Sequence, residues 1–322
     1  MKLVKIVAVL FIAFVMALSL HFAIPTDTAA AQGNQIVVGM AVHSLPTDSF
    51  WNVVDRGFKD AGKDLNVKVI DNGSHDPVKQ AQFVENYVAQ KVDGIVVSLA
   101  NPDALKDAIG KAVKAGIPVI TINSGAEVSA SLGAMAHVGQ TELVAGQGAG
   151  LRLNTLGVKH VLCVIHEESN VGLQDRCKGV AATFKGKVDN FSVATTGVND
   201  LAGTGSAIQN KLIADSTIDA IMSLNPDIGS TAADAIKASG KKVTLATFDL
   251  SPKVLDGIKA GTIAFAIDQQ QYLQGYLPVV MIKLYKQNLN VVGGGQPVLT
   301  GPGFVDASNV DQVKTLVSGG TR

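Results

Sequence analysis

The run Gln35-Ile-Val-Val-Gly-Met-Ala-Val42, followed by His43-Ser-Leu-Pro-Thr-Asp-Ser-Phe-Trp51, decides the fold class of this chain. The first part is short, apolar and rich in Val, without the period of a helix, so it predicts a buried strand. The second part is a polar turn ending in Phe50 and Trp51, where a helix pattern begins. An aromatic pair at the carboxyl end of a first strand lies where open α/β sheets bind ligands, although ordinary core packing explains such a pair equally well.

The alternation of strand and helix patterns continues along the whole chain after this stretch. Apolar strand patterns recur with amphipathic helix patterns between them, first over 36–122 and then, after a connection at 138–140, over 142–286, with one strand at 190–194. A Gly-rich passage at 292–295 and a short tail close the chain. Repeated strand–helix units predict parallel sheets with helices on both faces. The sequence therefore predicts an α/β protein of two similar doubly wound parallel-sheet lobes.

Composition limits the function classes. The chain has 322 residues, of which 47% are hydrophobic and 17% charged, and its formal net charge is zero. This balance gives no electrostatic reason to expect binding to nucleic acid or to an anionic membrane. It is typical of a soluble α/β protein.

The first 31 residues have the pattern of a targeting segment. Lys2 and Lys5 precede an uninterrupted apolar run from Ile6 to Leu20, and small residues at 29–31 follow it. This is the pattern of a secretory signal peptide, with cleavage expected after Ala31; a retained anchor is the alternative. We therefore expect a periplasmic or extracytoplasmic protein.

The chain has two cysteines, Cys163 and Cys177. One lies in a strand pattern and the other in the helix pattern that follows, so neighbouring elements bring them within disulfide reach. An exported chain meets an oxidising compartment, where a disulfide forms readily; two buried thiols are the alternative. Two cysteines make no zinc site, and neither has the partners of a catalytic cysteine.

Polar side chains follow several of the predicted strands directly: Ser44, Asp48, Asn123, Ser124, Asn225, Asp249, Asp268 and Gln269. Each alone is explained by a helix cap or a turn. Their recurrence at strand ends in both halves favours a ligand cleft, since carboxylates accept from hydroxyl groups and amides both donate and accept. An aromatic face then covers the C–H side of a sugar ring.

With these features in place, the chain resembles the type I periplasmic sugar-binding proteins, which are related to ribose-binding protein and to the sugar-binding core of LacI-type repressors. The resemblance spans the mature chain. Its most specific stretches are Phe50-Trp-Asn-Val-Val-Asp-Arg-Gly57, Lys91-Val-Asp-Gly-Ile-Val-Val97, Ala115-Gly-Ile-Pro-Val-Ile-Thr-Ile-Asn123, and Thr247-Phe-Asp249 with Asp256-Gly-Ile-Lys-Ala-Gly261.

The resemblance implies an interlobe cleft and a set of ligand-binding side chains. Asp48 stands where ribose-binding proteins have Asn, Gln174 where they have Arg, and Asn199 where they have a stacking Phe. We therefore expect a monosaccharide or sugar alcohol, with a different pentose, a hexose or a polyol favoured over ribose. His43 is expected at the cleft mouth, whereas Glu167 and Glu168 after His166 suit solvated loop positions. The full expected set is His43, Ser44, Asp48, Phe50, Trp51, Asn123, Gln174, Arg176, Asn199, Asn225, Asp249 and Gln269.

The resemblance also implies a domain division and partners. The N-terminal lobe is expected over 35–138 and 269–296, and the C-terminal lobe over 139–268 and 297–322, with the third crossing within 292–297. Such a monomer closes on its ligand by hinge bending and delivers it to an ABC transporter permease, without a cofactor or metal. A receptor for chemotaxis or sensing has the same fold and is the alternative.

An enzyme or a transcription regulator is not favoured. The sequence has no phosphate-binding loop and no Gly-x-Ser-x-Gly elbow, and Gly146-Gln-Gly-Ala-Gly150 falls inside a helix pattern rather than after a strand. A repressor needs a basic helix-turn-helix ahead of the core, where this chain has the predicted signal peptide.

Overall fold

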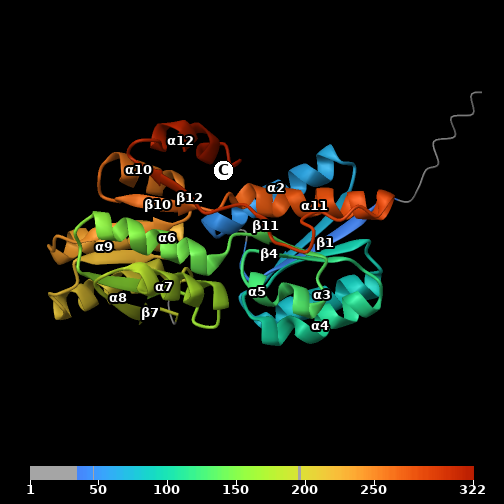
Figure 1. Cartoon of the computed structure of the whole chain (residues 1–322), viewed down its shortest axis with the longest axis horizontal. Helices are drawn as coiled ribbons and strands as arrows, with labels where there is room; N and C mark the ends of the chain where they lie inside the picture. Colours follow the sequence, from blue (N-terminus) through green and yellow to red (C-terminus); the bar gives the residue numbers. More distant parts are fainter. Residues whose placement is uncertain (1–34, 46, 195–196) are drawn as a thin grey trace, which may run out of the picture. The chain divides into compact units, whose positions relative to one another are not determined.

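A computed structural model describes residues 35–45, 47–194 and 197–322 (Figure 1). The predicted signal peptide at 1–31 lies outside the described residues. Within the described ranges, the strands form two six-stranded sheets and the helices pack on both faces of each. No helix in this part of the chain combines the length and the apolar character that a bilayer span requires. The predicted α/β architecture of two doubly wound lobes is confirmed.

The first sheet has the strand order β11-β5-β4-β3-β1-β2, and all its neighbours are parallel. Helices α2 and α11 cover one face, and α3 and α4 cover the other. The strands are β1 (Val37–Val42), β2 (Lys68–Gly73), β3 (Gly94–Ser98), β4 (Val119–Ile122), β5 (Ala136–Gly139) and β11 (Val298–Leu299). The helices are α2 (Ser49–Asp64), α3 (Pro77–Gln90), α4 (Pro102–Lys114), α5 (Ala126–Ser129), the short 3₁₀ helix η1 (Ala130–Leu132) and α11 (Gln271–Asn288).

The second sheet has the order β12-β10-β9-β8-β6-β7. Helices α6 and α7 cover one face, and α8, α9, α10 and α12 cover the other. Its strands are β6 (His160–Ile165), β7 (Lys187–Ser192), β8 (Ala220–Ser223), β9 (Thr244–Phe248), β10 (Phe265–Asp268) and β12 (Gly303–Asp306). Its helices are α6 (Glu142–Thr155), α7 (Val171–Thr183), α8 (Leu201–Ala214), α9 (Pro226–Ser239), α10 (Pro252–Lys259) and α12 (Val310–Ser318).

The chain passes between the sheets three times, and the third passage differs from the prediction. Strand β11 pairs with β5 of the first sheet, whereas β12 pairs antiparallel with β10 of the second. The passage therefore lies at 300–302, and the crossing expected within 292–297 is placed too early. A two-residue strand in a Gly-rich passage gives too little apolar pattern for sequence reasoning to detect.

Four other elements were mislocated by the sequence patterns. Strand β5 occupies most of the predicted connection at 138–140, and β12 and α12 form from the predicted tail. The edge strand β7 begins at Lys187 rather than at Asn190, because its residues are half exposed and include charged ones, which weakens an apolar signal. Edge strands need only one partner, so a polar sequence is compatible with them.

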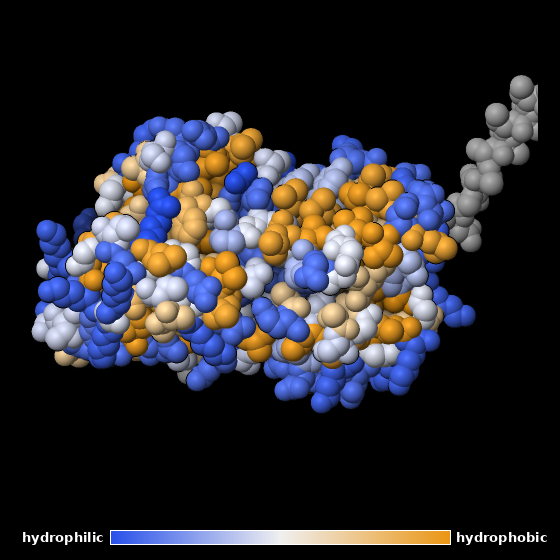
Figure 2. All heavy atoms as spheres, viewed as in Figure 1, coloured by the Kyte–Doolittle hydropathy of each residue, from blue (hydrophilic) through white to orange (hydrophobic). Residues whose placement is uncertain are grey.

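Glycines allow two helix pairs to pack with their backbones in contact. In α6, which contains the Gly-rich run 146–150, a Cβ at Gly146 would overlap the carbonyl of Arg176 in α7. Likewise a Cβ at Gly275 of α11 would overlap the carbonyl of Val54 in α2. These glycines serve helix–helix packing, and the run 146–150 is no phosphate-binding loop. Figure 2 shows the widest apolar area of this face over α2 and α11.

Cys163 of β6 and Cys177 of α7 form a disulfide, with their Cα atoms 6.0 Å apart. The bond closes a loop with a sequence separation of 14 residues, which includes the turn carrying His166 and Glu167. Both cysteines are buried in the core between β6 and α7. The disulfide therefore ties α7 to the strand that precedes it.

We expect the Cys163→Ala/Cys177→Ala double variant to lose about 3 kcal/mol of unfolding free energy, since the loop entropy removed from the unfolded chain is of this order for about 15 residues. Urea unfolding of the oxidised protein and of the variant measures the difference. Equal unfolding free energies of the two proteins would show that the disulfide does not stabilise the folded chain relative to the unfolded chain.

Candidate functional site

A set of convergent polar side chains lies in a pocket between the carboxyl ends of the two sheets. The pocket is narrow in this conformation, with a free volume of about 30 Å³ between the lining side chains. Six strands end directly beside it: β1, β4, β6, β8, β9 and β10. The lining residues are His43, Asp48, Phe50, Trp51, Asn123, His166, Glu167, Asn170, Leu173, Arg176, Leu224, Asn225, Asp249 and Gln269.

Asp48 and Asn225 face each other from opposite lobes, and each also caps a helix. Asp48 Oδ1 accepts from the backbone N–H of Phe50 at 2.8 Å, at the start of α2. Asn225 Oδ1 accepts from the backbone N–H of Asp227 at 2.8 Å, at the start of α9. Asn225 Nδ2 then donates to Asp48 Oδ2 at 3.1 Å across the pocket. Asp48 and Asn225 thus each cap a helix and also present a polar group to the pocket.

Asp249 and Gln269 form the opposite end of the pocket. Gln269 Nε2 donates to Asp249 Oδ1 at 2.8 Å. Gln269 Oε1 accepts from Gln274 Nε2 at 2.8 Å and from Asn123 Nδ2 at 3.3 Å, so its amide orientation is fixed from behind. Asn123 and Asp249 both have a left-handed backbone, with φ of 65° and 68°. Such conformations cost energy in non-glycine residues and concentrate at functional sites.

Arg176 is held by a buried ion pair. Its Nε and Nη2 donate to the two carboxylate oxygens of Glu142 at 2.6 and 2.9 Å, and the two side chains are 3% and 2% exposed. Its Nη1 donates to the carbonyl of Leu224 at 3.0 Å and lies 3.8 Å from Asp249 Oδ2. The charge of Arg176 is therefore already balanced by Glu142, and one edge of its guanidinium group faces the pocket.

The two pocket aspartates have raised pKa values. Burial raises the pKa of Asp249 to about 7, although Arg176 and the bond from Gln269 act to lower it. Burial, together with the nearby charge of Asp227, raises the pKa of Asp48 to about 6. Burial is the main cause of both shifts, so additional hydrogen-bond donors would favour the ionised carboxylates. Ligand hydroxyl groups would supply such donors.

The aromatic wall consists of Phe50, Trp51 and His43. The Trp51 ring meets the His43 ring edge-on at 4.8 Å and the Phe50 ring edge-on at 5.1 Å. His43 Nδ1 is hydrogen-bonded to the buried Ser98 Oγ at 2.7 Å, which fixes the imidazole plane. The wall is rigid before any ligand arrives.

Hydrogen bonds between the lobes surround the pocket, so this conformation is closed. Ser49 Oγ donates to Asp227 Oδ1 at 2.6 Å, and Ser124 Oγ donates to Asn170 Oδ1 at 3.0 Å. The backbone N–H of Val171 donates to the carbonyl of Ala100 at 3.1 Å. Six residues on both sides of the pocket therefore hold the two lobes together.

The pocket contains nine of the twelve expected ligand-binding residues. Three expectations do not agree with the geometry. Ser44 is buried outside the pocket, and Gln174 bonds to the carbonyl of Glu168 on the outer side of α7, since Arg176 two residues on occupies the inner side. Asn199 follows the edge strand β7 and reaches only a neighbouring cavity.

Sequence reasoning missed several lining residues. Glu167 was expected in solvent, yet its side chain is only 23% exposed and it accepts from Asn170 Nδ2 at 2.8 Å. Asn170 caps α7, and a cap signal three residues after Glu167 was the clue available in the sequence. Leu173 and Leu224 carry no polar signal at all.

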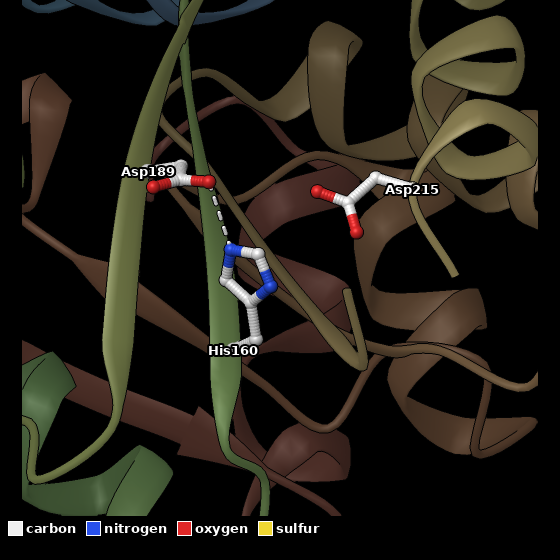
Figure 3. Close-up of side chains that lie close together, drawn as sticks. All are labelled: His160, Asp189 and Asp215. Atoms are coloured by element: carbon white, nitrogen blue, oxygen red, sulfur yellow. Dashed lines mark hydrogen bonds and ion pairs between the residues drawn. The ribbon is translucent and has the colours of Figure 1, made fainter. Parts of the chain in front are cut away.

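Outside the pocket, one group among the described residues has the composition of a metal site. It consists of His160, Asp189 and Asp215 (Figure 3). Both imidazole nitrogens are engaged, Nε2 with Asp189 Oδ2 at 2.9 Å and Nδ1 with Thr217 Oγ1 at 2.8 Å. Lys187 Nζ also donates to Asp189 at 2.7 Å. The group lies at the amino end of β6, away from the pocket, and is accounted for as a hydrogen-bond network.

Comparison with known proteins agrees with this architecture. The family model described as periplasmic binding protein domain matches residues 38–289. A carbohydrate transporter from Acidothermus cellulolyticus 11B, solved in complex with myo-inositol, superposes with a TM-score of 0.87 at 39% identity, covering 89% of this chain and 100% of that one. The ribose import binding protein of Haemophilus influenzae is 29% identical over 79% of this chain and 86% of its own length. A xylose/arabinose-binding protein of Sulfolobus acidocaldarius is 26% identical over 84% of this chain and 71% of its own. The chain belongs to the periplasmic binding protein domain family.

Proposed function

We propose that this chain is an extracytoplasmic solute-binding protein that captures a cyclic polyol of the myo-inositol class and delivers it to an ABC transporter permease. The observation that carries the proposal is the enclosure of one small pocket by Asp48 and Asp249 from opposite lobes, with amides between them. Two acceptors on opposite sides suit a ligand that presents hydroxyl groups around its whole ring.

The charge of the pocket excludes anionic ligands. Arg176 is the one Lys or Arg side chain among the lining residues that the structure describes, and Glu142 already pairs with it. A sugar phosphate or an amino-acid carboxylate would meet Asp48, Asp249 and Glu167 without a free cation. Hydroxyl groups, in contrast, match carboxylates and amides without adding negative charge.

The comparisons support a cyclitol over ribose. A relative with 39% identity was solved with myo-inositol, whereas the ribose-binding relative is 29% identical. The departure from the ribose-binding pattern at Asp48, which lines the pocket, points the same way. A ring with a hydroxyl group on every carbon can donate hydrogen bonds to Asp48 and Asp249 at the same time from opposite sides, and it has more hydroxyl groups for this than a pentose.

The pocket is arranged for binding rather than for chemistry. Its lining, as far as the structure describes it, includes no Ser, Cys, Thr, Lys or Tyr side chain that a base would activate. The lobes would open by bending at the three crossing segments, and a ligand that bonds to both lobes would favour closure.

Thermal unfolding with a panel of cyclitols and monosaccharides tests this function, with the fluorescence of Trp51 as a second signal. Trp51 is the only Trp of the chain and lines the pocket, so its emission reports on occupancy. A ligand at 100 times its Kd should stabilise the protein by about 2.7 kcal/mol. The proposal fails if neither the melting temperature nor the emission responds to any member of the panel.

Ligand affinity should fall as the pH is lowered from about 8 to 5. In the free closed form the pKa values of Asp249 and Asp48 are raised to about 7 and about 6. Hydroxyl donors favour the ionised carboxylates, so the bound pKa values are lower and binding releases protons near neutral pH. Each unit of difference between free and bound pKa corresponds to about a tenfold change in Kd.

Titration calorimetry at several pH values, in two buffers with different ionisation enthalpies, measures both effects. An affinity that is constant over this pH range, with the same enthalpy in both buffers, would contradict the role given to the two aspartates. Asp175→Asn, which removes a carboxylate of α7 that pairs with Lys178 outside the pocket, is a control that should keep the full pH dependence.

A further inference from the structure

A second cavity adjoins the ligand pocket on the side of α3. Its volume is about 920 Å³, including the solvent at its mouth. His43, His166, Glu167 and Asn170 line both cavities, so the two spaces meet at these side chains. A group attached to a ligand in the pocket would enter the second cavity between them.

The titratable groups that line this second cavity are Glu167, Glu168 and the imidazoles of His43, His75 and His166. Its described lining includes no Lys or Arg. Asn101, Asn170 and Asn199 add amides, which both donate and accept. The carboxylates are therefore the strongest acceptors that the space offers.

Glu167 has imidazoles rather than Lys or Arg side chains as its ion-pair contacts among the described residues. Burial acts to raise its pKa, but His43, His166 and the bond from Asn170 together lower it, so the group is ionised at neutral pH. Its oxygens lie 3.6 Å from His43 Nε2 and 4.0 Å from His75 Nδ1, beyond hydrogen-bond distance. The carboxylate therefore receives no direct hydrogen bond from either imidazole.

His166 provides a second, independent observation at the same junction. The residue is only 7% exposed, lines both cavities, and its Nδ1 has no hydrogen-bond partner among the described residues. Burial lowers the pKa of His166 to about 4, so the ring is neutral and one of its two nitrogens is an acceptor. Buried polar atoms without partners are rare in native proteins, so the one at this junction calls for a functional explanation.

We propose that the junction of the two cavities at Glu167 and His166 binds a protonated amino group, so that the preferred ligand is an amino-substituted cyclic polyol. This inference rests on the proposed function and names its substrate class. An ammonium group carries three donors and one positive charge, which matches the carboxylate of Glu167 and the imidazole of His166. A hydroxyl group at the same place has a single donor and brings no positive charge to Glu167.

A matched ligand pair tests the proposal by titration calorimetry on the mature chain at pH 7. Scyllo-inositol and its monoamine, scyllo-inosamine, differ by one hydroxyl group exchanged for an ammonium group. We expect the amine to bind about tenfold more tightly than the neutral cyclitol, which corresponds to about 1.4 kcal/mol. This preference should decrease with added salt because it is electrostatic.

Two variants test whether Glu167 causes the preference for the amine over the neutral cyclitol. Glu167→Gln keeps an acceptor for Asn170 but removes the charge, so the affinity ratio of the two ligands should fall to about three or less. Glu85→Gln, the same change on the exposed face of α3, should keep the wild-type ratio. The readout is a ratio within one protein, so a general loss of affinity does not alter it.

The outcomes separate this inference from the function on which it rests. If the neutral cyclitol binds and the amine binds no tighter, or if Glu167→Gln keeps the wild-type ratio, the inference is overturned and the polyol function stands. If neither ligand, myo-inositol nor any monosaccharide binds, the proposed function itself fails, and the inference fails with it.

Discussion

Replacing Asp249 by Asn should weaken polyol binding by about a hundredfold or more without lowering the melting temperature. In our account Asp249 accepts hydrogen bonds from ligand hydroxyl groups as an ionised carboxylate. Hydrogen bonds to charged groups contribute about 1.5–3 kcal/mol each, and a bound ring offers two such donors. The loss is therefore about 3 kcal/mol of binding free energy.

The fold should tolerate this change. Asn is isosteric with Asp and is among the residues that adopt the left-handed backbone found at position 249, where φ is 68°. Because burial raises the pKa of Asp249 to about 7, the ionised carboxylate is not favoured by the empty folded protein. A neutral amide removes that unfavourable charge, so the melting temperature should stay the same or rise.

Titration calorimetry and thermal unfolding of Asp249→Asn, with Asp175→Asn of α7, outside the pocket, as the control, measure the two quantities. Unchanged affinity in Asp249→Asn would remove this residue from the binding site. A large fall in melting temperature would instead show that Asp249 serves the fold, and that its place in the pocket is incidental.

The Arg176→Met variant should lose about 3–5 kcal/mol of unfolding free energy, the largest effect on stability that we expect from one substitution. The change leaves Glu142 as a buried carboxylate, 2% exposed, without the guanidinium group that balances it. Removing one partner of a buried ion pair has a cost of this size, because the remaining charge keeps its desolvation penalty. The aliphatic part of Arg176 is replaced by a side chain of similar length.

The Glu142→Gln/Arg176→Met double variant distinguishes this cause from lost packing. Removing the second charge should restore at least about half of the lost free energy, since Gln at position 142 leaves no buried charge. Urea unfolding of wild type and both variants gives the values. If the double variant is no more stable than the single one, the stability lost in Arg176→Met comes from packing rather than from an unbalanced charge.

Much of the fold was accessible from sequence because parallel sheets leave a strong pattern. Runs such as 94–97 and 161–165 are apolar throughout, as buried strands of doubly wound sheets are. The elements that were missed or misplaced lack this pattern: β7 and β11 are edge strands with polar or very short sequences, and β12 pairs antiparallel in a region expected to be a tail. Their position depends on tertiary pairing that no local pattern encodes.

The sequence predicted those residues of the candidate site that directly follow a strand. Asn123, Asn225 and Asp249 each follow a central strand, and the carboxyl ends of central parallel strands converge on one place. Their role in ligand binding stays a prediction. Positions beyond strand ends were less predictable, since a shift of two residues along α7 separates Gln174 from Arg176 by about half a turn.

The partners behind the pocket were the least predictable. Glu142 begins α6 after a crossing segment, far in sequence from Arg176, and nothing in its local sequence identifies it as a buried partner. Gln274 lies one turn into α11 and reaches Gln269 only because the chain crosses between the lobes there. Such residues come from how distant segments meet, which requires the structure.

Titration of the purified mature chain with myo-inositol at pH 8 tests the central claim most directly. We predict one site per chain, a Kd in the micromolar range or below, corresponding to about −8 kcal/mol or better, and a parallel change in Trp51 emission. The absence of binding at millimolar myo-inositol, together with tight binding of an anionic sugar at the same pocket, would contradict the account.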